Sequence, residues 1–279
     1  MLRQFSRTLF LCFLVFLFSA LTTRLAYANT ENYPALHTLK PGTLIVATYF
    51  TNPPFEYLKN KQEIGFEVDL IREIAKRLHL HLEFRNTQWE QIINELRDQH
   101  YDLIMGAITI TKEREKIIAF SKPYMTTTLS ILINTKKTPQ AKTIADLDNL
   151  TIGVQAKTTD FDIAKQMQKE GQIRGVKIYP FKNFNLAIDD LIAGRVGAVM
   201  KVFPVAYYYV EHHPELKILA VVPKAPQPLG FGMNPANQEL VQAVNQAQAE
   251  MQADGTYEKI FKKWFGGSPD KSNGNHQIE

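Results

Sequence analysis

The sequence predicts an α/β protein of two lobes, each a mostly parallel sheet flanked by helices. Short β-rich runs alternate with segments of helical apolar spacing, as they do where helices cover a parallel sheet. The alternation is interrupted twice, by a polar, lysine-rich stretch at residues 134–143 and by three prolines at residues 223–228. Two interruptions indicate two crossings between the lobes, with a cleft between them.

The first set of elements follows the turn signal Pro41-Gly42. After a strand at residues 44–48, a helix is expected, with one apolar face formed by Phe66, Leu70, Ile71, Ile74, Ala75 and Leu78. Glu67 and Asp69 occupy its first turn and suit the helix dipole, which we favour over a role as catalytic carboxylates. The set continues with a strand at 80–85, a helix that Trp89 begins, and a strand at 103–105.

The second set repeats the alternation, with strands at 151–154, 176–179, 196–200 and 216–222 and helices between them. Asn183 is expected to cap one helix and Gly194 to end it, and Pro204 stands in the first turn of the next. The prolines at 223–228 would form a stiff connector, and residues 229–233 a strand. Asn234-Pro235 would open a long helix that ends at Gly255, before a last helix at 257–265.

The N-terminus has the pattern of a secretory signal peptide, residues 1–28. Arg3 and Arg7 precede an apolar run at residues 9–21, and Ala26-Tyr27-Ala28 is an A-x-A cleavage site, so we expect cleavage after Ala28 and a periplasmic protein. An uncleaved anchor is the alternative, but the run is shorter than the ~20 residues of a spanning helix.

Charge and cysteine content exclude several classes of function. The three arginines before Asn29 leave 29 basic and 28 acidic residues in the rest of the chain, a balance that favours neither nucleic acid nor an anionic membrane as partner. The single cysteine, Cys12, lies in the apolar run without the small residues that precede a lipidated cysteine. The mature protein would therefore have neither disulfides nor cysteine metal sites.

Residues 105–124, MGAITITKEREKIIAFSKPY, contain the clearest candidate for chemistry. A buried strand would end at Gly106, and Thr111 is a plausible N-cap for a helical turn that starts at Lys112. The planar guanidinium of Arg114 can grip a carboxylate through two parallel hydrogen bonds. Taken alone, Arg114 is better explained as a solvated surface residue.

Seven segments in order resemble one family: VATYFTNPPFEYLKNKQEIG (46–65), GFEVDL (65–70), ITITKER (108–114), FSKPY (120–124), IADL (144–147), GVQAKTT (153–159) and DGTYEKIFKKWFG (254–266). The family is the bacterial extracytoplasmic solute-binding proteins, family 3, of the glutamine and lysine-arginine-ornithine-binding type, which feed polar amino acids to ABC importers. The resemblance covers roughly residues 39–266. It implies a type II periplasmic binding protein-like fold and a monomer without cofactor or catalysis, which passes a small carboxylate to an inner-membrane permease.

The resemblance also implies domain bounds. Lobe 1 would comprise residues 41–132 and 226–266, and lobe 2 residues 133–225. Residues 29–40 would form an N-terminal lead and residues 267–279 a polar, disordered tail.

Ligands of parallel α/β sheets lie beyond the carboxyl ends of the strands, and these ends coincide with the segments where the family holds its ligand. The residues expected there are Tyr49, Asn52, Trp89, Ala107, Thr109, Arg114, Gln155, Thr158, Lys201 and Val202. By resemblance, Thr109 and Thr158 would hydrogen-bond the ligand carboxylate beside Arg114, and Trp89 would stack on the ligand. The alternatives are loop hydroxyls and a core tryptophan.

The chain departs from the family at the ammonium site. Val202 stands where amino-acid binders usually have an aspartate, and Tyr49 where some have another acid. Lys157 and Lys201 add cations, so the cleft is expected to be rich in cations, with Asp160 as the nearest acid. A buried ammonium without a carboxylate would be destabilised by several kcal/mol. The histidine pairs at 79/81 and 212/213 lack a third ligand, so no metal is expected.

Two other functions are alternatives to solute binding. Some relatives of this fold are cyclohexadienyl dehydratases, which act on prephenate or arogenate and carry Asn-Pro-Gly-Gly-Thr where this chain has Gln155-Ala156-Lys157-Thr158. We find no Ser/His/Asp or Cys/His arrangement in the sequence. A receptor sensor domain would need a second membrane segment, and none follows Leu21 in the sequence.

Overall fold

The structure is a computed structural model, and it describes residues 36–267 of the chain. The predicted signal peptide at 1–28 lies outside the described residues, as do all but the first residue of the predicted tail.

The first lobe is built on a five-stranded mixed sheet of order β5-β1-β6-β13-β7. Its strands are β1 (Thr43–Thr48), β5 (His81–Asn86), β6 (Leu103–Ile104), β7 (Ala119–Phe120) and β13 (Gly232–Met233). β1 pairs in parallel with β5 and β6, whereas β13 runs antiparallel between β6 and β7. All six residues of β1 are buried, as expected of a central strand covered on both faces.

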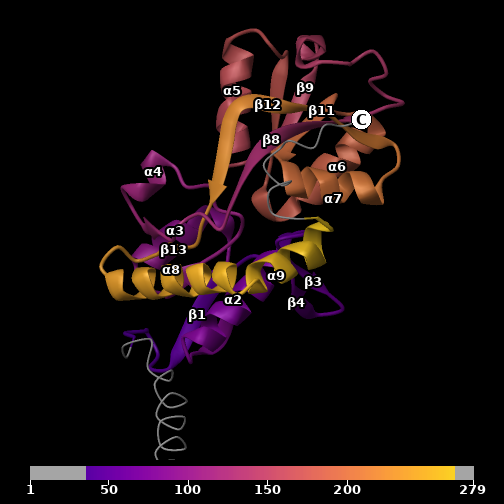
Figure 1. The fold of residues 1–279 in the computed structure, drawn as a ribbon. Coiled ribbons are helices and arrows are strands. Elements are labelled where there is room, and N and C mark those ends of the chain that lie inside the picture. Colours follow the sequence, from indigo (N-terminus) through magenta and orange to yellow (C-terminus); the bar gives the residue numbers. More distant parts are fainter. Residues whose placement is uncertain (1–35, 268–279) are drawn as a thin grey trace, which may run out of the picture. The chain divides into compact units, whose positions relative to one another are not determined.

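Four helices accompany this sheet: α2 (Phe66–Arg77), α3 (Trp89–Arg97), α8 (Gln238–Ala253) and α9 (Thr256–Phe265). The apolar face predicted for α2 is confirmed, since Phe66, Leu70, Ile71, Ile74 and Ala75 are buried. α8 and α9 come from the far end of the chain and pack against α2 (Figure 1). The C-terminal helices thus pack on a helix of the first lobe.

A three-stranded ribbon precedes α2 and was not predicted. It consists of β2 (Thr51–Asn52), β3 (Glu56–Lys59) and β4 (Gln62–Ile64), all antiparallel. Gly65 joins the ribbon to α2 with a φ of 143°, and a Cβ there would lie 2.0 Å from the carbonyl oxygen of Phe55. This junction holds Glu56 and Glu67 on adjoining elements.

The second lobe is built on a sheet of order β10-β9-β11-β8-β12. Its elements are β8 (Met125–Asn134), β9 (Thr151–Gln155), α5 (Thr159–Lys169), β10 (Gly175–Tyr179), α6 (Phe184–Ala193), β11 (Ala198–Val202), α7 (Phe203–His212) and β12 (Leu216–Leu229), with 3-10 turns at Ile144–Leu147 and Phe181–Asn183. β9 pairs in parallel with β10 and β11, and β8 runs antiparallel between β11 and β12. Each sheet is therefore mixed rather than mostly parallel.

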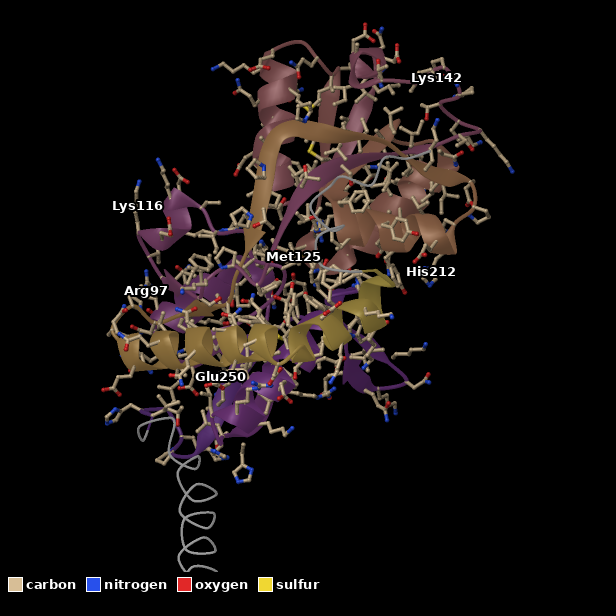
Figure 2. The ribbon with its side chains drawn as sticks, in the orientation of Figure 1. Arg97, Lys116, Met125, Lys142, His212 and Glu250 are labelled. Carbon is tan, nitrogen blue, oxygen red and sulfur yellow. The ribbon has the colours of Figure 1, made fainter. Side chains whose placement is uncertain are left out.

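The chain passes between the lobes along β8 and β12. Met125, the first residue of β8 (Figure 2), pairs with Leu229, and the two strands remain paired as far as Asn134 and Leu216. In Figure 1, β12 is the long arrow that leaves the second sheet toward β13. The chain therefore joins the second sheet at Met125, before the polar stretch at 134–143 where we expected the first crossing.

The prediction of a stiff connector at residues 223–228 is wrong, because these residues belong to the strand β12. Pro226 and Pro228 belong to β12 and face Thr128 and Thr126 of β8. β12 is an edge strand, and an edge tolerates residues without an N–H donor.

Two predicted helix starts also differ from the structure. The side chain of Asn183 makes no capping hydrogen bond, because a 3-10 turn leads directly into α6. α8 begins at Gln238 rather than at Asn234-Pro235, with the side chain of Asn237 accepting from the N–H of Leu240.

Within residues 36–267, no helix is both long and apolar enough to cross a bilayer. The same residues contain no group of three or more His, Cys, Asp or Glu side chains placed to hold a metal ion.

Candidate ligand-binding site

Arg114 lies on the short helix α4 (Lys112–Glu115), which follows the carboxyl end of β6. The predicted cap is confirmed, because the hydroxyl of Thr111 accepts from the N–H of Arg114 at 3.2 Å. The guanidinium donates to the carbonyl oxygens of Thr109 at 2.8 Å and Lys157 at 3.5 Å. Burial lowers its pKa, an effect opposed by Asp162, Tyr49 and Asp160. In the described part of the chain, no carboxylate lies within salt-bridge distance of Arg114.

Trp89 begins α3 and is buried with 8% of its surface exposed. Its Nε1 donates to the carbonyl oxygen of Lys157 at 3.2 Å, and the guanidinium carbon of Arg114 lies 5.2 Å from its ring centroid. Phe181, from the second lobe, stacks on the same ring at 4.7 Å. The predicted ligand platform is therefore covered by protein groups on both sides of the lobe boundary.

Tyr49 completes an aromatic box with Trp89. Its ring lies edge-on to Trp89 at 5.9 Å and to Phe181 at 4.4 Å, and its hydroxyl donates to the carbonyl oxygen of Gly106 at 2.8 Å. Burial, together with the charges of Glu56 and Glu67, raises the pKa of Tyr49 well above its ordinary value, so it stays a neutral donor.

Lys201 is the buried cation of the second lobe, with 5% of its surface exposed. It lies on β11, and its ammonium group donates to Oε1 of Gln155. The same group lies 5.3 Å from the ring of Phe181 and 5.1 Å from that of Phe184. Burial lowers the pKa of Lys201, and the charge of Asp160 opposes this shift. Within residues 36–267, no carboxylate forms a salt bridge with it.

The two predicted threonines use their hydroxyl donors within the protein. Thr109 donates to Oε1 of Gln227 at 2.8 Å, and Thr158 donates to the carbonyl oxygen of Gln155 at 2.7 Å. Thr158 also accepts from the N–H of Phe161 and so caps α5. Gln227 lies on β12 and accepts a second hydrogen bond, from Thr159 at 2.7 Å. A carboxylate bound here by either hydroxyl would have to displace one of these internal acceptors.

The remaining predicted residues lie on several elements of both lobes. Val202 is buried and precedes α7, and Asp160 is buried in the first turn of α5, where its Oδ2 accepts from the N–H of Gln155 at 3.4 Å. Ala107 donates its N–H to Oε2 of Glu67 at 2.9 Å. Asn52 is buried opposite Glu56 in the ribbon.

Comparison with known proteins shows the family of the chain. Residues 44–267 match the family model of bacterial extracellular solute-binding proteins, family 3. The chain belongs to this family.

Two solved structures and one sequence relative illustrate the likeness of this solute-binding protein. ABC transporter arginine-binding protein 1 of Escherichia coli is 31% identical over 226 residues, which are 79% of this chain and 88% of that protein. An ancestral arginine-binding protein bound to arginine is 36% identical with a TM-score of 0.74, over 81% of this chain and 99% of that one. The ancestral amino acid-binding protein AncCDT-1, a precursor of cyclohexadienyl dehydratase, is 34% identical with a TM-score of 0.72, over 80% and 96%. The fold is the type II periplasmic binding protein fold.

The structure adds three residues to the candidate site or its surroundings that were not predicted from the sequence. Phe181 follows the carboxyl end of β10, so the strand-end rule applied to residues 176–179 would have found it. Gln227 lies in the proline-rich segment at residues 223–228, for which the sequence predicts a connector. Glu56 lies in the ribbon, for which the sequence carried no recognisable signal.

Glu56 and Glu67 form a buried pair of carboxyl groups beneath Tyr49, both with no exposed surface. Glu67 accepts from the hydroxyl of Tyr124 at 2.6 Å and from the N–H of Ala107. Neither oxygen of Glu56 has a hydrogen bond of good geometry. Burial, and then the charge of Glu67, raises the pKa of Glu56 well above its ordinary value. Glu67 thus does more than complement the helix dipole: it anchors the loop that carries Ala107.

A surface hollow of about 710 Å³ is lined by residues that include Lys40, Arg85 and His100 and by none of the predicted ligand-binding residues. Lys40 and Arg85 both pair with Glu83, so the hollow offers no unpaired cation comparable with Arg114.

Proposed function

We propose that this solute-binding protein is the periplasmic substrate-binding component of an ABC importer, that it binds a small carboxylate of the amino-acid type between its lobes, and that it delivers this ligand to an inner-membrane permease. The observation that carries the proposal is Arg114, a half-buried residue whose guanidinium donates, among the described residues, to two carbonyl oxygens. A carboxylate is a stronger, charge-assisted partner than a carbonyl and can accept two parallel bonds. Relatives described as arginine-binding and cystine-binding support a ligand of this class.

Two residues of the second lobe, Lys201 and Val202, restrict the chemical class of ligand that we propose. Lys201 is a buried cation with an amide as its hydrogen-bond partner, and Val202 supplies no carboxylate beside it. A ligand that brings its own second anionic or acceptor group would satisfy Lys201, whereas a cationic side chain would be repelled. We therefore place dicarboxylates and acidic or neutral polar amino-acid derivatives ahead of arginine.

Asp160 is buried, and its charge acts on both Lys201 and Arg114. It is our candidate partner for an α-ammonium group, since a buried ammonium needs an anion or several acceptors. Tyr49, Asn52, Trp89, Ala107, Thr109, Gln155 and Thr158 stay our candidates for the rest of the ligand shell.

The proposal also covers the mature N-terminus, the location, the oligomeric state, the need for a cofactor and catalysis. The mature protein would begin after Ala28, act in the periplasm as a monomer and need no cofactor. We propose binding without catalysis. The likeness to AncCDT-1 favours binding over dehydration, because that protein is described as an amino acid-binding precursor of the dehydratase.

A thermal-shift screen of the mature protein tests the proposal. The panel comprises amino acids, opines, dicarboxylates and keto acids, and a ligand at one hundred times its Kd should stabilise the protein by about 2.7 kcal/mol. Prephenate is added as a separate sample, with its conversion to phenylpyruvate followed by absorbance. A folded protein that no member of the panel stabilises would contradict the proposal, and turnover of prephenate would replace it with the dehydratase.

A further inference from the structure

Phe181 is a residue of the second lobe that packs into an apolar cluster of the first. It follows β10 and has 4% of its surface exposed. The other buried members of the cluster come from the first lobe: Ile45, Ala47, Tyr49, Trp89, Ile92, Leu96, Tyr101, Ile104, Ile108 and Ile118. Phe181 therefore forms apolar contacts between the two lobes.

The contacts of Phe181 in the box are direct. Its ring is nearly parallel to that of Trp89, with 4.7 Å between centroids and 21° between planes, and its edge contact with Tyr49 is 4.4 Å. The first separation is at the short end of the range for aromatic rings in contact, and the second is just below it. No side chain of a ligand can be inserted between Phe181 and Trp89 without moving one of them.

Phe181 is also held in position by polar groups on both lobes. Nε2 of Gln155 donates to its carbonyl oxygen at 2.6 Å, and its N–H donates to Oε1 of Glu90, on α3, at 3.5 Å. The ammonium group of Lys201 lies 5.3 Å from its ring, within the range of a cation–π contact. The ring thus has a defined place, set by its backbone as well as by its apolar contacts.

We infer that Phe181 is a specificity-determining residue that competes with the ligand's side chain for the aromatic box of Tyr49 and Trp89. The inference rests on the proposed function and adds a rule of selection to it. A ligand with a bulky apolar side chain must displace Phe181, and its apparent affinity falls by the fraction of molecules in which the box is open. A short ligand held through Arg114 and Lys201 is spared this cost.

Two alanine variants isolate the effect. Phe181→Ala empties the box, and Phe184→Ala is the matched control, because Phe184 is equally buried and also lies over Lys201 but has no ring contact with Tyr49 or Trp89. Both are made with Trp264→Phe, since the chain has two tryptophans and Trp89 then becomes the only one. Circular dichroism checks folding, and Phe181→Leu replaces the alanine variant should that variant not fold.

The first measurement needs no ligand. Acrylamide quenching of Trp89 should rise at least about twofold in Phe181→Ala and stay unchanged in Phe184→Ala, because only the first removes the ring that covers Trp89. Equal quenching in Trp264→Phe alone and in Trp264→Phe combined with Phe181→Ala would overturn the inference.

The second measurement is calorimetric titration with L-phenylalanine, L-alanine and L-aspartate. The affinity for phenylalanine relative to alanine should rise about tenfold or more in Phe181→Ala and stay as in wild type in Phe184→Ala. An equal loss for all three ligands would overturn the inference, because Phe181 would then support binding instead of competing with it. If the larger panel also fails to bind any variant, the proposed function fails, and the quenching result alone decides whether Phe181 closes the box.

Discussion

The guanidinium of Arg114 donates to the carbonyl oxygen of Lys157 across the lobe boundary, at 3.5 Å. The same carbonyl accepts from Nε1 of Trp89, and Lys157 has a φ of 58°, in the left-handed region. A non-glycine residue pays for this conformation in free energy, which the contacts made by its backbone must offset. The carbonyl of Lys157 thus takes the position on Arg114 that we propose for a ligand carboxylate.

Lys201→Ala should weaken an acidic ligand far more than a monocarboxylate. Loss of a charge-assisted hydrogen bond costs about 1.5–3 kcal/mol, so the affinity for a dicarboxylate should fall about tenfold or more, as measured by calorimetric titration. Lys157→Ala is the control, because its side chain is exposed and its carbonyl is retained. Equal losses for both ligand types would show that Lys201 supports the fold of the site and does not select the ligand.

Val202→Asp should shift the ligand preference toward α-ammonium groups. A carboxylate at this buried position adjoins Lys201 and can pair with a cation, so binding of the native ligand should weaken and glutamine or arginine should bind more tightly. Val202→Asn adds a polar group of the same size without charge and should leave the preference nearly unchanged. Should wild-type protein bind a free α-amino acid tightly and Val202→Asp alter nothing, an acid other than residue 202 holds the ammonium, with Asp160 first among the candidates.

Glu56→Gln should flatten the dependence of stability on pH. Because burial and the charge of Glu67 raise the pKa of Glu56, the folded protein binds this proton more tightly than the unfolded chain does. The resulting stabilisation is complete below the ordinary value of 4.5 and is lost as the pH rises through the raised pKa of the folded state. Each unit by which the pKa is raised corresponds to about 1.4 kcal/mol.

Thermal melts between about pH 5 and about pH 8 measure this effect. Wild type should lose stability across the range, and Glu56→Gln should lose less, since its amide cannot ionise. Glu258→Gln, at an exposed position on α9, should behave as wild type. Parallel curves for wild type and Glu56→Gln would contradict a protonated Glu56 in the folded state.

Elements with local signals were predicted from the sequence. The apolar spacing of α2, the cap at Thr111 and the left-handed glycine at Gly194 all depend on neighbouring residues, and the structure confirms them. The strand at 216–222 was predicted, but the continuation of β12 through residues 223–228 could not be, because prolines become acceptable only once β8 has taken the inner position and left β12 at the edge. That order is a property of the sheet and cannot be read from residues 216–229.

The candidate site likewise has residues that the sequence predicts and contacts that it does not. Topology placed Arg114, Trp89 and Lys201 at strand ends, where the structure also has them. The sequence could not show that Thr109 and Thr159 both donate to Gln227, a residue 118 positions after the first of them. Nor could it show that Phe181 reaches the cluster of the first lobe, because that contact depends on how the two lobes meet.

Calorimetric titration of Arg114→Ala tests the central claim most directly. Arg114 is partly exposed and is not a member of the apolar cluster, which it touches through the ring of Trp89. The variant should therefore fold as wild type does and lose measurable binding of the ligand found in the screen. Arg114→Lys should recover little, because an ammonium group cannot reproduce the paired hydrogen bonds. A folded Arg114→Ala that binds this ligand with wild-type affinity would contradict the account, since the ligand's carboxylate would then be held elsewhere.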